Sequence, residues 1–260
     1  MTAIDTAGIL ARFDAELRAD PPAEAEAEFK RAGFERAWVD GVLRTLGPYN
    51  LIHWWDFEAE RAPEIARREA AFFRGKEVEW KVYSHDRPPG LEAALRLAGF
   101  EPGEPETLVV FDMETAALPE PPADIDVREV RDVAGVADLT AVTAAAFDQD
   151  ARPADELLQR LEGPTLALFV AYDDGRPVSS GRLELAPGSA FAGLYGGGTI
   201  PSHRGRGVYR ALVAARAAEA RRRGHRFLTV DARETSRPIL QRLGFQPLAT
   251  IRGWTLGGEG

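Results

Sequence analysis

The residues best suited to chemistry stand in one short loop, Arg204-Gly205-Arg206-Gly207, which a helical pattern follows from Val208 onward. The first N–H groups of a helix have no partner inside the helix, and the helix dipole adds positive charge at that end. Glycine has no Cβ, so this loop can take left-handed dihedrals and approach a ligand closely, while the two arginines add charged donors. We therefore expect an anion site here, and phosphate is the anion that such a site suits.

Two familiar phosphate motifs do not fit this loop. A P-loop needs Lys and then Ser or Thr after its last glycine, and a dinucleotide motif needs a further glycine where Arg210 stands. The segment instead resembles the acetyl-CoA signature of the GCN5-related N-acetyltransferases (GNAT), Arg/Gln-x-x-Gly-x-Gly/Ala. Arg204, Gly207 and Tyr209 occupy its fixed positions, and Tyr209 departs from the usual Gly or Ala.

The resemblance implies that acetyl-CoA is the cosubstrate. In that family the loop wraps the pyrophosphate, and the pantetheine arm lies between two parallel strands that splay apart. Backbone N–H groups near Thr199 and Ile200 would then position the thioester and stabilise the oxyanion. The expected cofactor-binding residues are Thr199, Ile200, Arg204, Gly205, Arg206, Gly207, Val208 and Tyr209.

Acetyl transfer to an amine also needs a base, because a free alkyl amine is mostly protonated at pH 7. Glu184 is the candidate base, on the strand before the one that leads into the signature loop. On that strand it shares a face with Arg182. A solvated glutamate paired with Arg182 is the structural alternative.

The thiolate leaving group needs a proton, and the sequence offers several hydroxyls. The family often has Tyr four residues before the glycine of Leu243-Gly244-Phe245, but Leu240 stands there. Ser236 and Tyr209 are the candidate acids, and Tyr195 is a further hydroxyl. Ser236 also suits the cap of the last helix, and solvent can supply the proton instead.

Composition excludes several classes of function. The 260 residues include no cysteine, which removes disulfides, thiolate catalysis and Cys-based zinc sites. A net charge of -9 argues against nucleic acid as a partner. His203 and His225 have no neighbouring carboxylate in the sequence, so we expect no metal. With no leader and no apolar stretch near the ~20 residues that cross a bilayer, we expect a soluble cytoplasmic protein without membrane contact.

The C-terminal half reads as strand, two helices, three strands, helix, strand, helix and strand. Asp132 is placed to cap the first helix. The three consecutive strands form an expected antiparallel meander, over Leu166–Tyr172, Val178–Leu185 and Phe191–Thr199. The helix after the loop is amphipathic, with Arg216, Arg221 and Arg222 expected on its outer face. A strand, crossover helix and strand imply parallel pairing.

The N-terminal half carries alternating helical and strand patterns. Helices are expected over residues 2–19, 23–38, 58–74 and 88–98, and strands over residues 50–55, 78–82 and 107–111. The ending Leu97-Ala98-Gly99-Phe100 recurs as Arg242-Leu243-Gly244-Phe245, each time after a strand, a polar turn and a helix. This weak repeat suggests a degenerate copy of the same fold. It lacks the Arg-Gly loop, so we do not expect it to bind CoA in that mode.

The sequence therefore predicts an α/β protein with the GNAT fold, a mixed sheet with splayed parallel central strands, in a tandem of a degenerate and an intact copy. We expect a degenerate domain at 1–117, a proline-rich linker at 118–124 and an N-acetyltransferase domain at 125–260. The expected activity moves an acetyl group from acetyl-CoA to a primary amine of a small molecule or a peptide. A non-catalytic acetyl-CoA-binding or sensing protein is the alternative, because of Leu240 and Tyr209. An acyl or aminoacyl transferase on the same fold is the third reading, and the oligomeric state is open.

Overall fold

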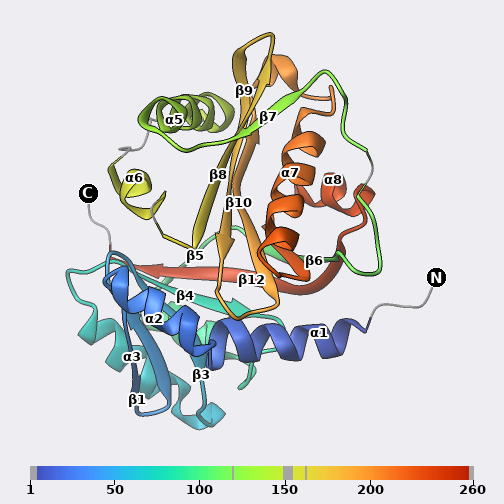
Figure 1. The fold of residues 1–260 in the computed structure, drawn as a ribbon. Helices are drawn as coiled ribbons and strands as arrows, with labels where there is room; N and C mark the ends of the chain where they lie inside the picture. Colours follow the sequence, from blue (N-terminus) through green and yellow to red (C-terminus); the bar gives the residue numbers. More distant parts are fainter. Residues whose placement is uncertain (1–4, 119, 149–154, 162, 258–260) are drawn as a thin grey trace. The chain divides into compact units, whose positions relative to one another are not determined.

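The structure, a computed structural model, describes residues 5–118, 120–148, 155–161 and 163–257 (Figure 1). The chain packs into two compact units. The first unit comprises Met1–Leu108, Asp231–Arg237 and Pro247–Gly260, and the second comprises Val109–Val230 and Pro238–Gln246. The predicted division into a domain at 1–117, a linker at 118–124 and a domain at 125–260 stays a prediction. Pro119 of that linker and residues 2–4 of the first predicted helix lie outside the described residues.

The second unit is built on a mixed sheet. Its strand order is β6-β11-β10-β9-β8-β7. The strands are β6 (Glu106–Asp112), β7 (Asp126–Glu129), β8 (Leu166–Asp173), β9 (Arg176–Leu185), β10 (Phe191–Thr199) and β11 (Phe227–Ala232), of which β6 and β11 also extend into the first unit. β7 to β10 pair antiparallel in succession, and β10 pairs parallel with β11. The predicted meander and the parallel crossover are both confirmed.

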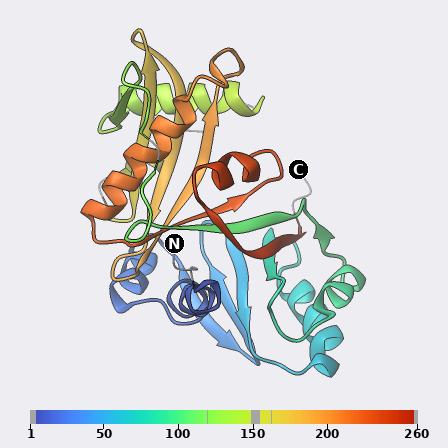
Figure 2. The same ribbon diagram turned by 90° about the vertical axis from the view of Figure 1, so that its right-hand side faces the viewer.

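Helices cover both faces of this sheet (Figures 1 and 2). The helices are α5 (Val133–Phe147), α6 (Asp155–Leu161), α7 (Val208–Arg222) and α8 (Arg237–Arg242), with the short 3₁₀ turn η3 (Pro201–His203) before α7. Successive residues of β9 face opposite helices, as a pleated strand requires. Ser180 bonds to Thr143 of α5 at 3.0 Å, whereas Gly181 lies against Arg216 of α7. Asp132 caps α5 as predicted, its Oδ1 accepting from the N–H of Gly135 at 2.8 Å.

The first unit repeats the same order of strands. Its strand order is β1-β2-β3-β4-β12, with the short β5 beside β12. The strands are β1 (Glu35–Val39), β2 (Val42–Leu46), β3 (Asn50–Trp55), β4 (Val78–Tyr83), β5 (Glu101–Pro102) and β12 (Gln246–Leu256). β1, β2 and β3 form an antiparallel meander, and β3 then pairs parallel with β4. The connection between β3 and β4 contains a helix, as the connection between β10 and β11 does, and this supports the predicted repeat.

The helices of the first unit lie along the N-terminal part of the chain. They are α1 (Thr6–Phe13), the π-helix η1 (Asp14–Ala19), α2 (Ala23–Arg31), the 3₁₀ turn η2 (Ala59–Arg61), α3 (Ala62–Phe72) and α4 (Leu91–Leu97). One expectation was wrong: the helix predicted over residues 23–38 ends at Arg31, and β1 follows. Gly33 has φ of 81° and ends the helix. The partner of β1 is β2, a strand absent from the prediction.

A buried ion pair lies against the core of the first unit. The core gathers apolar residues of β2, β3, β4, β12, α3 and α4, with Trp80 and Trp254 fully buried. Arg44 of β2 donates to both carboxylate oxygens of Glu69 on α3, at 2.6 and 2.9 Å. The Glu69 side chain has no exposed area, and that of Arg44 is 8% exposed. Such a pair adds little net stability as a whole, but removing one partner strands a charge in the core.

We expect Glu69→Met to lower the free energy of unfolding by about 3 kcal/mol, because Arg44 is left buried without its carboxylate. The double variant Arg44→Met/Glu69→Met is expected to recover most of this loss, since it buries no isolated charge. Glu64→Gln, at an exposed position of the same helix, is the matched control with little change. Urea unfolding measures all three, and an equal loss in the single and double variants would contradict the argument.

Candidate functional site

The central feature of the second unit is the early parting of its two parallel strands. β10 and β11 pair through Phe191 with Phe227, Ala192 with Leu228, and Gly193 with Thr229. Among the described residues the pairing does not continue, although β10 extends to Thr199. Beyond Gly193, one edge of β10 still pairs with β9. The opposite edge has no paired strand among the described residues. This is the splay that the sequence predicts.

A bulge shapes the same end of β10. Its register against β9 shifts between Tyr195 and Gly198, and Gly196 has φ of 57°. A Cβ at Gly197 would come within 3.0 Å of the Tyr209 ring and 3.2 Å of Arg216 Nη2. The bulge glycines therefore make room for two large side chains of α7. Part of the space beside this strand end is therefore taken by the protein itself.

Arg216 corrects one expectation about α7. It was expected on the outer face of the helix, but it is fully buried. Its Nε and Nη1 donate to the carbonyls of Leu212 and Arg182, both at 3.2 Å. Burial lowers the pKa of the Arg216 guanidinium below its usual range, and the neighbouring Tyr209 opposes that shift. The signal in the sequence was the pair Gly181 and Gly197, whose missing side chains leave the space that this guanidinium fills.

The loop before α7 has the geometry expected of an anion site. Gly205 and Gly207 have φ of 77° and 81°, in the left-handed region that glycine favours. Gly207 is the N-cap of α7, and no side chain of the described residues accepts a bond there. The first N–H groups of α7 are thus not capped by the protein, and they carry the positive end of the helix dipole.

The two arginine side chains of the loop already have protein partners. Arg204 donates from Nε to the carbonyl of Thr199 at 3.1 Å and from Nη2 to that of Ala146 at 2.9 Å. Arg206 Nη1 pairs with Asp173 Oδ2 at 2.9 Å. His203 Nε2 lies 3.3 Å from the same carboxylate oxygen. The arginines therefore hold the loop in place, and the backbone is the more available source of donors.

Thr199 and Ile200 lie at the junction between β10 and this loop. The N–H of Ile200 donates to the carbonyl of Val178 at 3.0 Å, so this donor is used within the sheet. The hydroxyl of Thr199 lies 2.9 Å from that of Ser179, which is fully buried. Ser179 also donates to the carbonyl of Gly198 at 2.7 Å. This polar cluster fixes the end of β10, and the sequence analysis did not single out Ser179.

Glu184 lies on β9 opposite Gly193, the last residue of β10 that pairs with β11. Its carboxylate accepts from Arg160 Nη2 at 2.5 Å and lies 3.5 Å from Arg182 Nε. The side chain is 26% exposed. The ion pair with Arg182 agrees with the structural alternative, and the position beside the strand parting keeps Glu184 a candidate base.

The candidate hydroxyls are distributed between the two units. Tyr209 is half-buried against Gly197 in the second unit, and Tyr195 folds its ring over Gly193 and is 37% exposed. Ser236 belongs to the first unit and donates to the carbonyl of Arg233 at 3.2 Å. Leu240 is fully buried, so the family's tyrosine position is a core position here.

The described residues contain neither a cluster of metal-binding side chains nor a helix that could span a membrane. No group of three or more histidine and carboxylate side chains is placed there to bind a metal ion. None of the helices in the described ranges combines the length and the apolar character that crossing a bilayer requires.

The comparisons with known proteins agree with this architecture. Residues 135–245 match the sequence model of the acetyltransferase (GNAT) family. A GCN5-related N-acetyltransferase from Kribbella flavida is 19% identical, with a TM-score of 0.68 over 90% of this chain and 93% of that one. A tandem GNAT protein from the clavulanic acid biosynthesis pathway is 16% identical, with a TM-score of 0.63 over 98% and 95%. At these identities the likeness shows the fold. No curated protein matches the chain.

We expect Gly205→Ala to cost about 1 kcal/mol of unfolding free energy, because alanine is strained in the left-handed region and no atom lies within 4 Å of the new methyl. Gly207→Ala should cost more, since its Cβ would also lie 2.7 Å from Pro122 Cγ. Denaturant unfolding of this matched pair checks the order. Equal losses would show that the contact between Gly207 and Pro122 does not constrain the loop.

Proposed function

Residues 135–245 form an acetyltransferase domain of the GNAT family, and from this premise we propose that the chain transfers an acetyl group from acetyl-CoA to a primary amine. The domain makes the chain an acyltransferase, and its donor and acceptor are the proposal. The observation that carries it is the splayed end of β10 leading into the uncapped N-terminus of α7. The end of β10 would supply a free strand edge, and the N-terminus of α7 would supply an anion site.

The residues present fit acetyl-CoA through their backbone. The N–H groups of Val208 and Tyr209 in the first turn of α7 would hold the pyrophosphate, and the left-handed Gly205 and Gly207 allow it to come close. The free edge at the end of β10 would bind the amide groups of the pantetheine arm as a neighbouring strand does. Arg204 and Arg206 would act by fixing the loop through Thr199, Ala146 and Asp173.

The proposed reaction needs one base and one acid. The amine nitrogen loses its proton and attacks the thioester carbonyl, and the carbon–sulfur bond then breaks to give an amide and a thiolate. Glu184 would accept the amine proton, directly or through water, from its place beside the strand parting. Tyr209 would donate a proton to the thiolate, from its place against the bulge of β10. Ser236 remains a second candidate for the acid.

A non-catalytic acetyl-CoA-binding protein is the alternative, and one observation favours it. The ring of Tyr209 and the guanidinium of Arg216 fill space beside Gly197 that a smaller residue at position 209 would leave open. Leu240 stands at the family's tyrosine position and is fully buried, so this position supplies no hydroxyl for catalysis. The two functions differ in turnover, whereas both require binding.

We expect acetyl-CoA to bind to the protein alone. We expect it to be consumed only when a primary amine acceptor is also present. Because the chain has no cysteine, a thiol reagent reports released CoA without any signal from the protein. A panel of small amines and short peptides with free N-termini is screened with this assay, and mass spectrometry of the acceptor confirms the acetyl group.

Calorimetry with acetyl-CoA, done on the same preparation, separates the possible outcomes. Binding with turnover supports the transferase, and binding without turnover on any amine supports the sensing protein. No binding to the folded protein would overturn both proposals.

Glu184→Gln and Tyr209→Phe test the assigned roles. We expect each to lower kcat roughly 100-fold with little change in the affinity for acetyl-CoA, because a positioned acid or base contributes about this factor. Arg160→Gln removes a partner of Glu184 without removing the carboxylate, so it is the matched control and should retain most activity. Full activity in Tyr209→Phe would transfer the role of acid to Ser236 or to solvent.

A further inference from the structure

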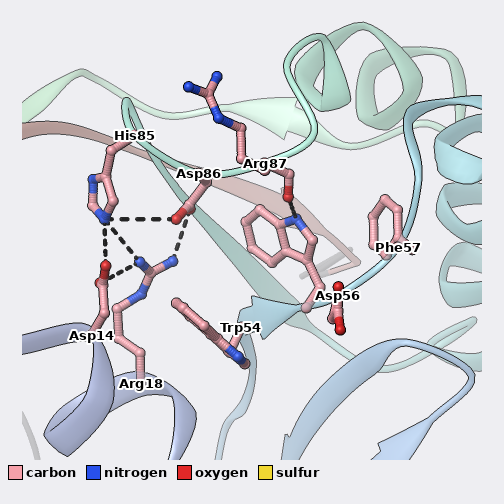
Figure 3. A pocket seen from close by; sticks show the side chains of 9 residues that line it. Asp14, Arg18, Trp54, Asp56, Phe57, His85, Asp86 and Arg87 are labelled. Atoms are coloured by element: carbon pink, nitrogen blue, oxygen red, sulfur yellow. Dashed lines mark hydrogen bonds and ion pairs between the residues drawn. The ribbon is translucent and has the colours of Figure 1, made fainter. Parts of the chain in front are cut away.

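The first unit contains a cavity of about 270 Å³ that the proposed reaction does not use (Figure 3). Its walls come from three segments. The π-helix η1 contributes Asp14 and Arg18, the end of β3 and the loop after it contribute residues 54–57, and the segment after β4 contributes residues 85–87. A π-helix is a rare element that is frequently found at functional sites.

The cavity lies where two parallel strands part. β3 and β4 pair through Asn50 with Val78, Leu51 with Glu79, and Ile52 with Trp80. The lining residues 54–57 and 85–87 follow this pairing on both strands. The cavity therefore lies at the carboxyl ends of two parallel strands, which is where α/β sheets commonly bind ligands.

One end of the cavity is an ionic cluster in which the three guanidinium nitrogens of Arg18 all donate to protein oxygens. Arg18 Nη1 donates to Asp14 Oδ1 at 2.6 Å, its Nη2 donates to Asp86 Oδ2 at 2.8 Å, and its Nε donates to the carbonyl of His53 at 2.9 Å. His85 Nε2 lies 2.7 Å from Asp14 Oδ2. Figure 3 shows these groups converging on the two carboxylates. Although burial opposes it, the bonds to His85 and Arg18 lower the pKa of Asp14, so this carboxylate is charged at neutral pH.

The rest of the cavity is aromatic and acidic. The Trp54 ring already accepts one cation, since the Arg18 guanidinium lies 5.0 Å from its centroid. The Trp55 and Phe57 rings are stacked with centroids 6.4 Å apart. Asp56 stands between them in the sequence and is exposed, and no described residue pairs with its carboxylate. The Arg87 guanidinium points away from Trp54 and Asp56 in Figure 3.

The equivalent loop of the second copy has the opposite charge. There the segment after the splayed strand contains Arg204 and Arg206 with left-handed glycines, whereas the segment after β3 contains Asp56, Glu58 and Glu60. Acidic side chains near the start of a helix repel phosphate. Carboxylates beside indole faces instead attract a cation, because both the charge and the ring quadrupole favour it.

We propose that this cavity binds a small organic cation, held by the carboxylates of Asp56 and Asp86 and the indole ring of Trp54. The site goes beyond acetyl transfer, since it lies within the first unit and needs no acyl-CoA. Its binding can be measured in the absence of acetyl-CoA, so its failure and the failure of the transferase proposal are distinguishable.

The test uses choline, which carries a permanent charge, and its neutral isostere 3,3-dimethylbutan-1-ol. We expect calorimetry on the full chain to show saturable binding of choline and of butylammonium, and at least tenfold weaker binding of the neutral isostere. Asp56→Asn should weaken choline binding roughly fivefold and Trp54→Leu roughly tenfold. Glu64→Gln removes a negative charge from the same unit outside the cavity and should leave binding unchanged.

Three outcomes overturn the proposal. They are absence of saturable binding for both cations, equal binding of choline and its neutral isostere, and unchanged binding in Asp56→Asn with a wild-type thermal midpoint. Because Asp56 is exposed, its variant is expected to fold even if Trp54→Leu does not. Asp56→Asn therefore keeps the test decisive.

Discussion

The structure depends on one constraint, that its central parallel strands pair over three residues and then separate. Backbone N–H and C=O groups need partners, so those at the separated ends of such strands must bind side chains, a ligand or solvent. In the second unit, β10 bulges between Tyr195 and Gly198. In the first unit, the register between β2 and β3 shifts between Leu43 and Arg44. In both copies, the parallel strands therefore separate at the same point of the fold, and their backbone groups there need a partner other than a strand.

The two copies fill that place differently. In the second unit, Tyr209 and Arg216 reach the bulge from α7, because Gly181 and Gly197 leave room for them. The loop then presents uncapped N–H groups at the start of α7. In the first unit, aromatic rings and carboxylates line a cavity, and a guanidinium is neutralised at one end by two aspartates. We therefore propose that one order of strands supports an anion site in one copy and a cation site in the other, because the loops after the strands carry opposite charge.

Each copy buries charged side chains between a helix and its sheet. Arg44 and Glu69 lie beside the apolar core of the first unit, and Arg216 lies between the sheet and α7 in the second. Hydrogen bonds offset part of the cost of burying such charges, through Glu69 for Arg44 and through two backbone carbonyls for Arg216. Arg44 thus links β2 to α3, and Arg216 links α7, the helix that follows the candidate anion site, to β9.

The sequence by itself determined the elements that local patterns control. Apolar segments separated by turn residues predicted the strands β8, β9 and β10, Asp132 predicted the cap of α5, and the glycines at positions 205 and 207 predicted the left-handed loop. The repeated order of elements indicated the tandem fold. These features depend on neighbours in the chain, so the chain reports them directly.

Only the tertiary structure decided which polar groups meet. Arg216 was expected at the surface because it is charged, but the sheet supplies carbonyls and the space of two glycines, which makes burial possible. Arg204 and Arg206 were expected to face a ligand, whereas Ala146 and Asp173, distant in sequence, bind them. The cluster of Asp14, Arg18, His85 and Asp86 was absent from the sequence reading. Its members come from segments about 70 residues apart, as the contact between Asp14 and His85 shows. A local pattern carries no information about such partners, because folding alone brings them together.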